Sequence, residues 1–148
     1  MDLSFGAVLG VFFRWLHISS VVCLIGGFVY ARFAVWPALQ ALGSQTAVFE
    51  SRMIAQFRGL LYTILAANLI SGLYNFLTKP SYPPHYQMVI GIKFLFVLHI
   101  YAVTILYTLP TGDTAKRQRW LTGMVTTGLI IIALSAVLRL LSLNALQH

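Results

Sequence analysis

Four long apolar segments, separated by three short polar connections, constrain this chain more than any other feature of its sequence. The segments run approximately over residues 9–36, 60–77, 88–109 and 120–141. Each is long enough to cross the hydrocarbon core of a bilayer as an α-helix, which takes about 20 residues. No segment alternates apolar and polar residues as a membrane-spanning strand must. The sequence therefore predicts an all-α integral membrane protein with four spanning helices.

The composition agrees with this prediction, because 59% of the 148 residues are hydrophobic and only 9% are charged. Soluble domains carry roughly 25% charged residues, so this chain has too few to cover a surface exposed to water. The formal net charge of +7 is interpreted as charge flanking membrane helices. No polar segment combines a basic stripe with aromatic residues, so we expect a lipid bilayer as partner and no nucleic acid.

Short connections favour an up-down four-helix bundle, formed here by a single domain over residues 1–148. The second connection contains Lys79, whereas the basic residues in or beside the first and third connections are Arg52, Arg58, Lys116, Arg117 and Arg119. Lys and Arg are enriched in cytoplasmic loops of membrane proteins. The sequence therefore predicts that the basic loops lie in the cytoplasm and that both termini lie outside.

Two histidines fall inside the predicted spans. His17 lies roughly 12 Å along the first span and His99 about 16 Å along the third, at the helical rise per residue. Both spans enter from the outer side and are diagonal partners in an up-down bundle, so two inward imidazoles can reach opposite faces of one haem. The sequence thus predicts His17 and His99 as metal ligands of a haem b. Lys93 competes with His99 as the second functional residue of the third span.

Three basic residues, Arg14, Lys93 and Arg139, also lie in or near the apolar segments. The three acidic residues of the chain are Asp2, Glu50 and Asp113, and none falls in a predicted span. Charged groups in a membrane usually face a partner, so we expect an anionic ligand such as a haem with its propionates. Arg14 and Arg139 can instead extend to lipid headgroups, and each histidine can be a packing residue.

A polar stripe runs along one face of the second span. It consists of Asn68, Ser71, Gly72 and Asn75, which are spaced as on one face of a helix. Such a stripe either lines a site or holds helices together, and both interpretations stay open. The candidate cofactor-binding residues are His17, His99, Lys93, Arg14, Arg139, Asn68 and Asn75.

The stretches RWLHISSVVCLIGGFVYARF and GIKFLFVLHIYAVTILYT resemble the small bacterial membrane proteins grouped around the CopD copper-resistance proteins and the HemJ-type protoporphyrinogen oxidases. The residues that match the family pattern are Arg14, His17, Gly26, Gly27, Arg32 and Lys93, while Leu24 stands where the family has a tryptophan. The resemblance implies a protein of the bacterial cytoplasmic (inner) membrane. It also implies either haem binding with porphyrinogen oxidation, or copper uptake. The scattered methionines do not favour a path for soft Cu(I).

Two classes of function follow. One is a b-type haem-binding redox or electron-transfer protein or subunit, with a protoporphyrinogen-oxidase-like enzyme as a variant. The other is a non-catalytic accessory subunit that packs against other subunits of a larger membrane complex. The sequence contains no catalytic carboxylate pair, cysteine cluster or nucleotide-binding loop, so any chemistry must come from a bound cofactor. Whether the chain is an enzyme stays open.

Overall fold

The structure is a computed structural model that describes residues 4–78, 84–110 and 113–144. Its elements are α1 (Phe5–Tyr30), a π-helical turn (Ala31–Val35), α2 (Trp36–Gln40), a 3₁₀ turn (Gly43–Gln45), α3 (Thr46–Leu77), α4 (Pro84–Thr108) and α5 (Thr114–Asn144). No strand occurs among the described residues, and the prediction of an all-α fold is confirmed.

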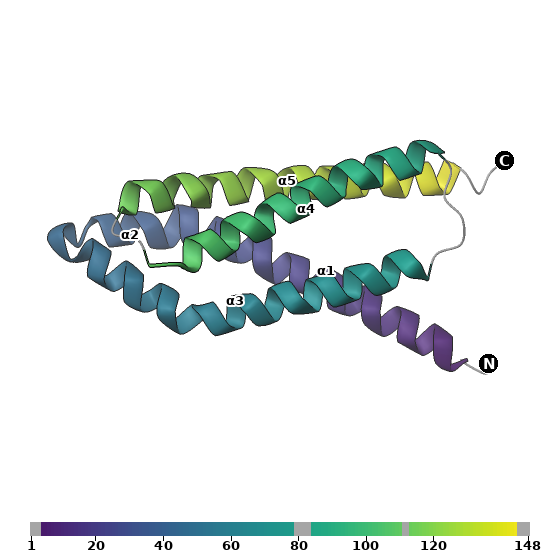
Figure 1. Cartoon of the computed structure of the whole chain (residues 1–148), viewed down its shortest axis with the longest axis horizontal. Helices are drawn as coiled ribbons and strands as arrows, with labels where there is room; N and C mark the ends of the chain where they lie inside the picture. Colours follow the sequence, from purple (N-terminus) through teal and green to yellow (C-terminus); the bar gives the residue numbers. More distant parts are fainter. Residues whose placement is uncertain (1–3, 79–83, 111–112, 145–148) are drawn as a thin grey trace.

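The long helices lie along one axis of the molecule, with both termini at one end (Figure 1). The opposite end contains α2 and the connection between α4 and α5 (Figure 1). α1 packs closely against α3, and α4 packs closely against α5, whereas α3 and α4 touch only sparsely. The helices therefore form two tight pairs, and the contact between α3 and α4 is the loosest between consecutive long helices.

The helices are longer than the apolar segments from which they were predicted. α3 begins at Thr46 rather than near Leu60, and α5 begins at Thr114 rather than near Trp120. The Glu, Gln, Lys and Arg residues that flank the apolar segments are good helix formers, so the helices continue into polar sequence. The apolar segments mark only the parts suited to lipid, and much of the expected first connection is helical.

A widened turn interrupts the first long helix just before Pro37. Proline has no amide hydrogen and its ring crowds the carbonyl four residues earlier, so a regular α-helical bond to Phe33 is impossible there. The amide of Trp36 donates instead to the carbonyl of Ala31, five residues back. The chain thus keeps its helical course through Gln40 with one π-helical turn.

A tight turn joins α2 to α3 at Gly43, whose φ of 59° is the one positive φ among the described residues. A residue without Cβ adopts this conformation without strain. The hydroxyl of Thr46 donates to the carbonyls of Leu39 and Gly43, both at 2.7 Å. These bonds fix the start of α3 against the end of α2.

Candidate functional site

The polar stripe of α3 faces α1. The side-chain amide of Asn68 donates to the Ser20 hydroxyl at 3.2 Å, and that of Asn75 donates to the Phe13 carbonyl at 3.2 Å. Asn68 and Ser71 are buried. Of the two interpretations left open by the sequence, helix-to-helix packing accounts for these contacts directly, because the stripe pairs α3 with α1.

His17 lies at the centre of this contact and is half-buried. Its Nδ1 atom is 3.3 Å from the Asn68 carbonyl oxygen and 3.3 Å from the Ser71 hydroxyl oxygen. A Cβ added at Gly72 would lie only 3.1 Å from Cε1 of the ring. Gly72 therefore leaves the space that the imidazole occupies against α3.

The partners of Nδ1 assign the tautomer of His17. A backbone carbonyl can only accept, and the single hydroxyl hydrogen of Ser71 is directed to the Ala67 carbonyl at 2.6 Å. The proton of a neutral His17 ring therefore belongs on Nδ1, which leaves Nε2 with its lone pair. Within the described part of the chain no hydrogen bond engages Nε2. An imidazole held in this way is suited to bind a metal or accept a proton through Nε2.

A chain of hydrogen bonds connects His17 to α4. The Tyr101 hydroxyl donates to the Asn68 side-chain oxygen at 2.8 Å, and the Ser20 hydroxyl donates to the His17 carbonyl at 2.9 Å. Together with the bond from Asn68 to Ser20, these contacts join α1, α3 and α4. Tyr101 was not among the candidate residues, although a tyrosine inside an apolar span is a signal, because its hydroxyl needs a partner.

Lys93 is half-buried on α4 and lies close enough to His17 for their charges to interact. The structure thus brings His17 and Asn68 into contact where α1 and α3 meet, and Lys93 on α4 adds a positive charge that acts on His17. An imidazole near a cation can bind an anionic ligand that contains a metal ion, because the imidazole can coordinate the metal and the cation can pair with the negative charge.

His99 is exposed and lies in a different contact. It lines an open groove of about 360 Å³ between α4 and α5, together with Ile92, Leu95, Phe96 and Thr127. The contacts of His17 are with α3, so the two histidines belong to different helix pairs. Arg14 and Arg139 are exposed as well, and none of their described contacts joins them to the His17 site.

Glu50 and Arg117 form a second polar cluster that the sequence argument did not find. The Arg117 Nη1 atom lies 3.5 Å from Glu50 Oε2, and the two side chains are 4% and 0% exposed. Both residues were assigned to polar connections, but each lies inside a helix because α3 and α5 begin earlier than predicted. The signal in the sequence was the isolation of Glu50, the one acid between Asp2 and Asp113.

The Glu50 cluster is incompletely hydrogen-bonded. Arg117 Nη2 donates to the Leu109 carbonyl at 3.3 Å. Within the described residues, both carboxylate oxygens of Glu50 and Nε of Arg117 are buried without a hydrogen-bond partner. A buried ion pair with unsatisfied atoms gives little net stability, yet removal of one partner leaves an uncompensated charge. The cluster connects α3, α5 and the end of α4.

Among the residues that the structure describes, no three His, Cys, Asp or Glu side chains gather as a metal site. A haem needs only one or two axial side chains, so this finding bears on other metal centres. No family model matches the chain, and no match was found among curated proteins or solved structures. The resemblance to the CopD-like and HemJ-type proteins stays a prediction from the sequence.

Proposed function

We propose that this chain is an integral membrane protein whose four long helices cross the bilayer as an up-down bundle. Four helices are long and apolar enough to cross, and large apolar side chains cover their outer surfaces. Val11, Leu95 and Leu98 are about 70% exposed, for example. Apolar surface on this scale is unfavourable in water and favourable in lipid. The basic end with Arg52, Lys116 and Arg119 is then cytoplasmic, and the termini face outside.

Within this protein, the site of His17 and Lys93 is the best candidate for binding a haem b. The proposal rests above all on the hydrogen bond between His17 Nδ1 and the Asn68 carbonyl. Histidines that bind metals almost always donate their other ring hydrogen to a carbonyl or carboxylate, which fixes the ring and its tautomer. His17 meets this requirement, and Nε2 is the atom that would hold the haem iron.

The other residues of the site fit the same ligand in part. Lys93 supplies a cation on α4 for a propionate, and Asn68 with Tyr101 holds α3 and α4 beside the histidine. His99 lines the groove between α4 and α5, so we propose His17 as the principal ligand. A bound haem would supply one-electron redox chemistry, and the chain would act as a redox or electron-transfer protein or subunit.

The test is the absorption spectrum of protein purified from membranes, with single His17→Ala and His99→Ala variants. We expect a reduced-minus-oxidised difference typical of b haem, most of it lost in His17→Ala and retained in His99→Ala. Loss of the haem spectrum in both variants would support the arrangement expected from the sequence, in which His17 and His99 both bind the haem. Full haem content in His17→Ala, or no haem in wild-type protein supplied with haem during expression, would refute the proposal.

A non-catalytic accessory subunit is the second candidate, and the packing of the stripe favours it. Asn68, Ser71 and Asn75 all make hydrogen bonds between or within helices, which is sufficient reason for their presence. In this case the chain should co-purify with other membrane subunits and contain no haem. A single subunit that purifies intact with its own haem would count against this candidate.

A further inference from the structure

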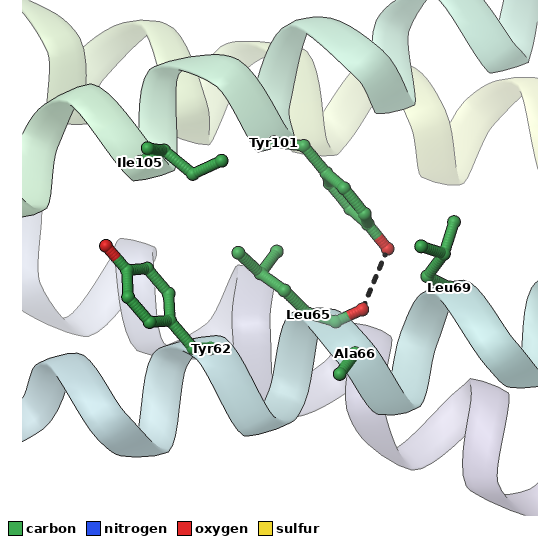
Figure 2. Close-up of a pocket in the computed structure, with 6 residues that line it drawn as sticks. All are labelled: Tyr62, Leu65, Ala66, Leu69, Tyr101 and Ile105. Atoms are coloured by element: carbon green, nitrogen blue, oxygen red, sulfur yellow. Dashed lines mark hydrogen bonds between the residues drawn. The ribbon is translucent and has the colours of Figure 1, made fainter.

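An open groove of about 330 Å³ separates α3 from α4 (Figure 2). Its lining residues are Tyr62, Leu65, Ala66, Leu69, Tyr101 and Ile105. Tyr62, Leu69 and Ile105 are 39%, 56% and 47% exposed, so the groove opens to the side of the molecule. The groove exists because α3 and α4 touch sparsely, and Ala66 contributes little volume to the gap.

Two tyrosines bridge the gap and leave the space between them apolar. The Tyr62 hydroxyl of α3 bonds to the Thr108 hydroxyl of α4 at 2.7 Å. The Tyr101 hydroxyl of α4 donates to the Leu65 carbonyl of α3 (Figure 2). It also donates to the Asn68 side-chain oxygen. Because both hydroxyls already have partners, an occupant needs to offer hydrocarbon and no polar group at this depth.

A basic residue continues the groove face of α3 toward the polar end. Arg58 is exposed and precedes Tyr62, Leu65, Ala66 and Leu69 by four, seven, eight and eleven residues, the spacing of a single helix face. It stands about 6 Å before Tyr62 along the helix axis. Arg58 also immediately precedes the apolar segment, at the level where headgroups meet hydrocarbon. Its guanidinium is suited to pair with phosphate through two parallel hydrogen bonds.

We propose that this groove binds one acyl chain of an anionic phospholipid from the basic side of the membrane, with the lipid phosphate on Arg58. This inference rests on the proposed membrane insertion and is independent of the haem. An apolar groove with a cation at its interfacial end matches the two parts of such a lipid. Basic sites between membrane helices on the cytoplasmic side are suited to anionic headgroups. An uncharged partner helix would not supply a negative group to pair with Arg58.

Native mass spectrometry of the whole protein in mild detergent, titrated with phosphatidylglycerol or phosphatidylcholine, tests the proposal. Arg58→Gln should weaken phosphatidylglycerol binding roughly tenfold, since a charge-assisted phosphate contact contributes at least about 1.4 kcal/mol. Phosphatidylcholine should bind less tightly than phosphatidylglycerol to the wild type. Ala66→Phe, which fills the groove, should weaken both lipids.

Matched controls separate the groove from general basicity and bulk. Arg52→Gln removes an exposed charge about 120° around α3 from Arg58 and should leave lipid binding unchanged. Ala136→Phe adds the same bulk on the exposed surface of α5 and should also have no effect. Inorganic phosphate should not displace the lipid, because the acyl chain anchors it.

Three outcomes would overturn the inference. Equal phosphatidylglycerol binding by Arg58→Gln and wild type would show that Arg58 does not bind the lipid phosphate. Equal binding by Ala66→Phe and wild type would show that the acyl chain does not lie in the groove. Displacement by inorganic phosphate would make Arg58 a simple anion site. Failure of the membrane proposal is distinguishable, because the wild-type protein would then stay dispersed and folded without detergent.

Discussion

At the contact between α1 and α3, the imidazole of His17 is held through Nδ1 and lies against Gly72. The ring therefore has a fixed orientation that depends on residues of a different helix. Ser71 and Asn68 supply the acceptors, and the missing side chain at position 72 supplies the space. Whatever His17 binds, its Nε2 direction is set by these three residues of α3.

Gly72→Ala should disturb this contact. The new methyl group would meet the His17 ring at 3.1 Å, so the ring must shift or α1 and α3 must separate slightly. Overpacking of this kind costs about 1–3 kcal/mol, and we expect a lower melting temperature in detergent, measured by circular dichroism. Gly91→Ala on α4 is the control, because a Cβ there meets nothing within 4 Å. If both variants have the same melting temperature as the wild type, the contact between Gly72 and His17 is not tight.

Sequence reasoning at the residue scale succeeded where helical spacing alone was sufficient. The spacing of Asn68, Ser71 and Asn75 correctly put them on one face of a helix, and that face meets α1. The spacing did not reveal that Nδ1 of His17 bonds to the Asn68 carbonyl. Every residue has a backbone carbonyl, so the residue type does not identify this partner. The role of Tyr101 was missed for a related reason, since its partners are on another helix.

At the scale of elements, α3 and α5 combine an apolar span with a polar helical extension. The extensions bring Glu50 and Arg117 together, although apolar length alone assigned both to loops. Hydropathy measures suitability for lipid, whereas helix propensity decides where the helix begins, and the two differ most at the ends. The positions of the long apolar helices could therefore be predicted from the sequence, and the polar contact between their extensions could not.

A double-mutant cycle on the Glu50–Arg117 pair tests its energetic role. Glu50→Gln leaves a buried cation without a countercharge, and Arg117→Met leaves a buried carboxylate, so each single variant should lose about 3–5 kcal/mol of unfolding free energy. The double variant should be more stable than the sum of the single effects implies, because no unpaired charge remains. Unfolding in detergent with increasing denaturant, followed by circular dichroism, measures all four proteins.

Arg119→Gln is the matched control for the cycle, because Arg119 is an exposed cation in the same part of α5. Substitutions of this kind usually change stability by less than about 0.5 kcal/mol. Additive effects of the two single changes would mean that Glu50 and Arg117 do not interact in the folded protein.

At the scale of the whole molecule, two tight helix pairs meet along a loose line. The termini share one end, and α3 and α5 begin at the other (Figure 1). The first halves of α3 and α5 carry four exposed basic residues, Arg52, Arg58, Lys116 and Arg119. The groove between α3 and α4 opens along this loose contact. The described residues thus contain a polar site that connects α1, α3 and α4, and a buried ion pair between α3 and α5. They also line two open grooves, one between α3 and α4 and one between α4 and α5.

The orientation is tested by labelling single cysteines with a membrane-impermeant maleimide. In a Cys23→Ser background, Lys116→Cys should react only after the membrane is opened, because the proposed orientation puts the basic end in the cytoplasm. Ser4→Cys, at the end with the termini, should react in intact cells. Lys116 is preferable to Arg117 because its side chain is exposed whereas that of Arg117 is buried. Labelling of Lys116→Cys in intact cells would show that the orientation is the reverse of the proposed one.

The Glu50–Arg117 pair also sets a requirement on the order of biosynthesis. Ribosomes produce Glu50 long before Arg117, so a nascent chain contains the carboxylate through the synthesis of α4 without its positive partner. The charge is neutralised by the pair only when the first turn of α5 emerges and docks beside α3. A chain truncated before α5 would retain the unpaired acid, and cellular quality control removes such incompletely stabilised proteins. The final helix therefore completes the assembly of residues made much earlier.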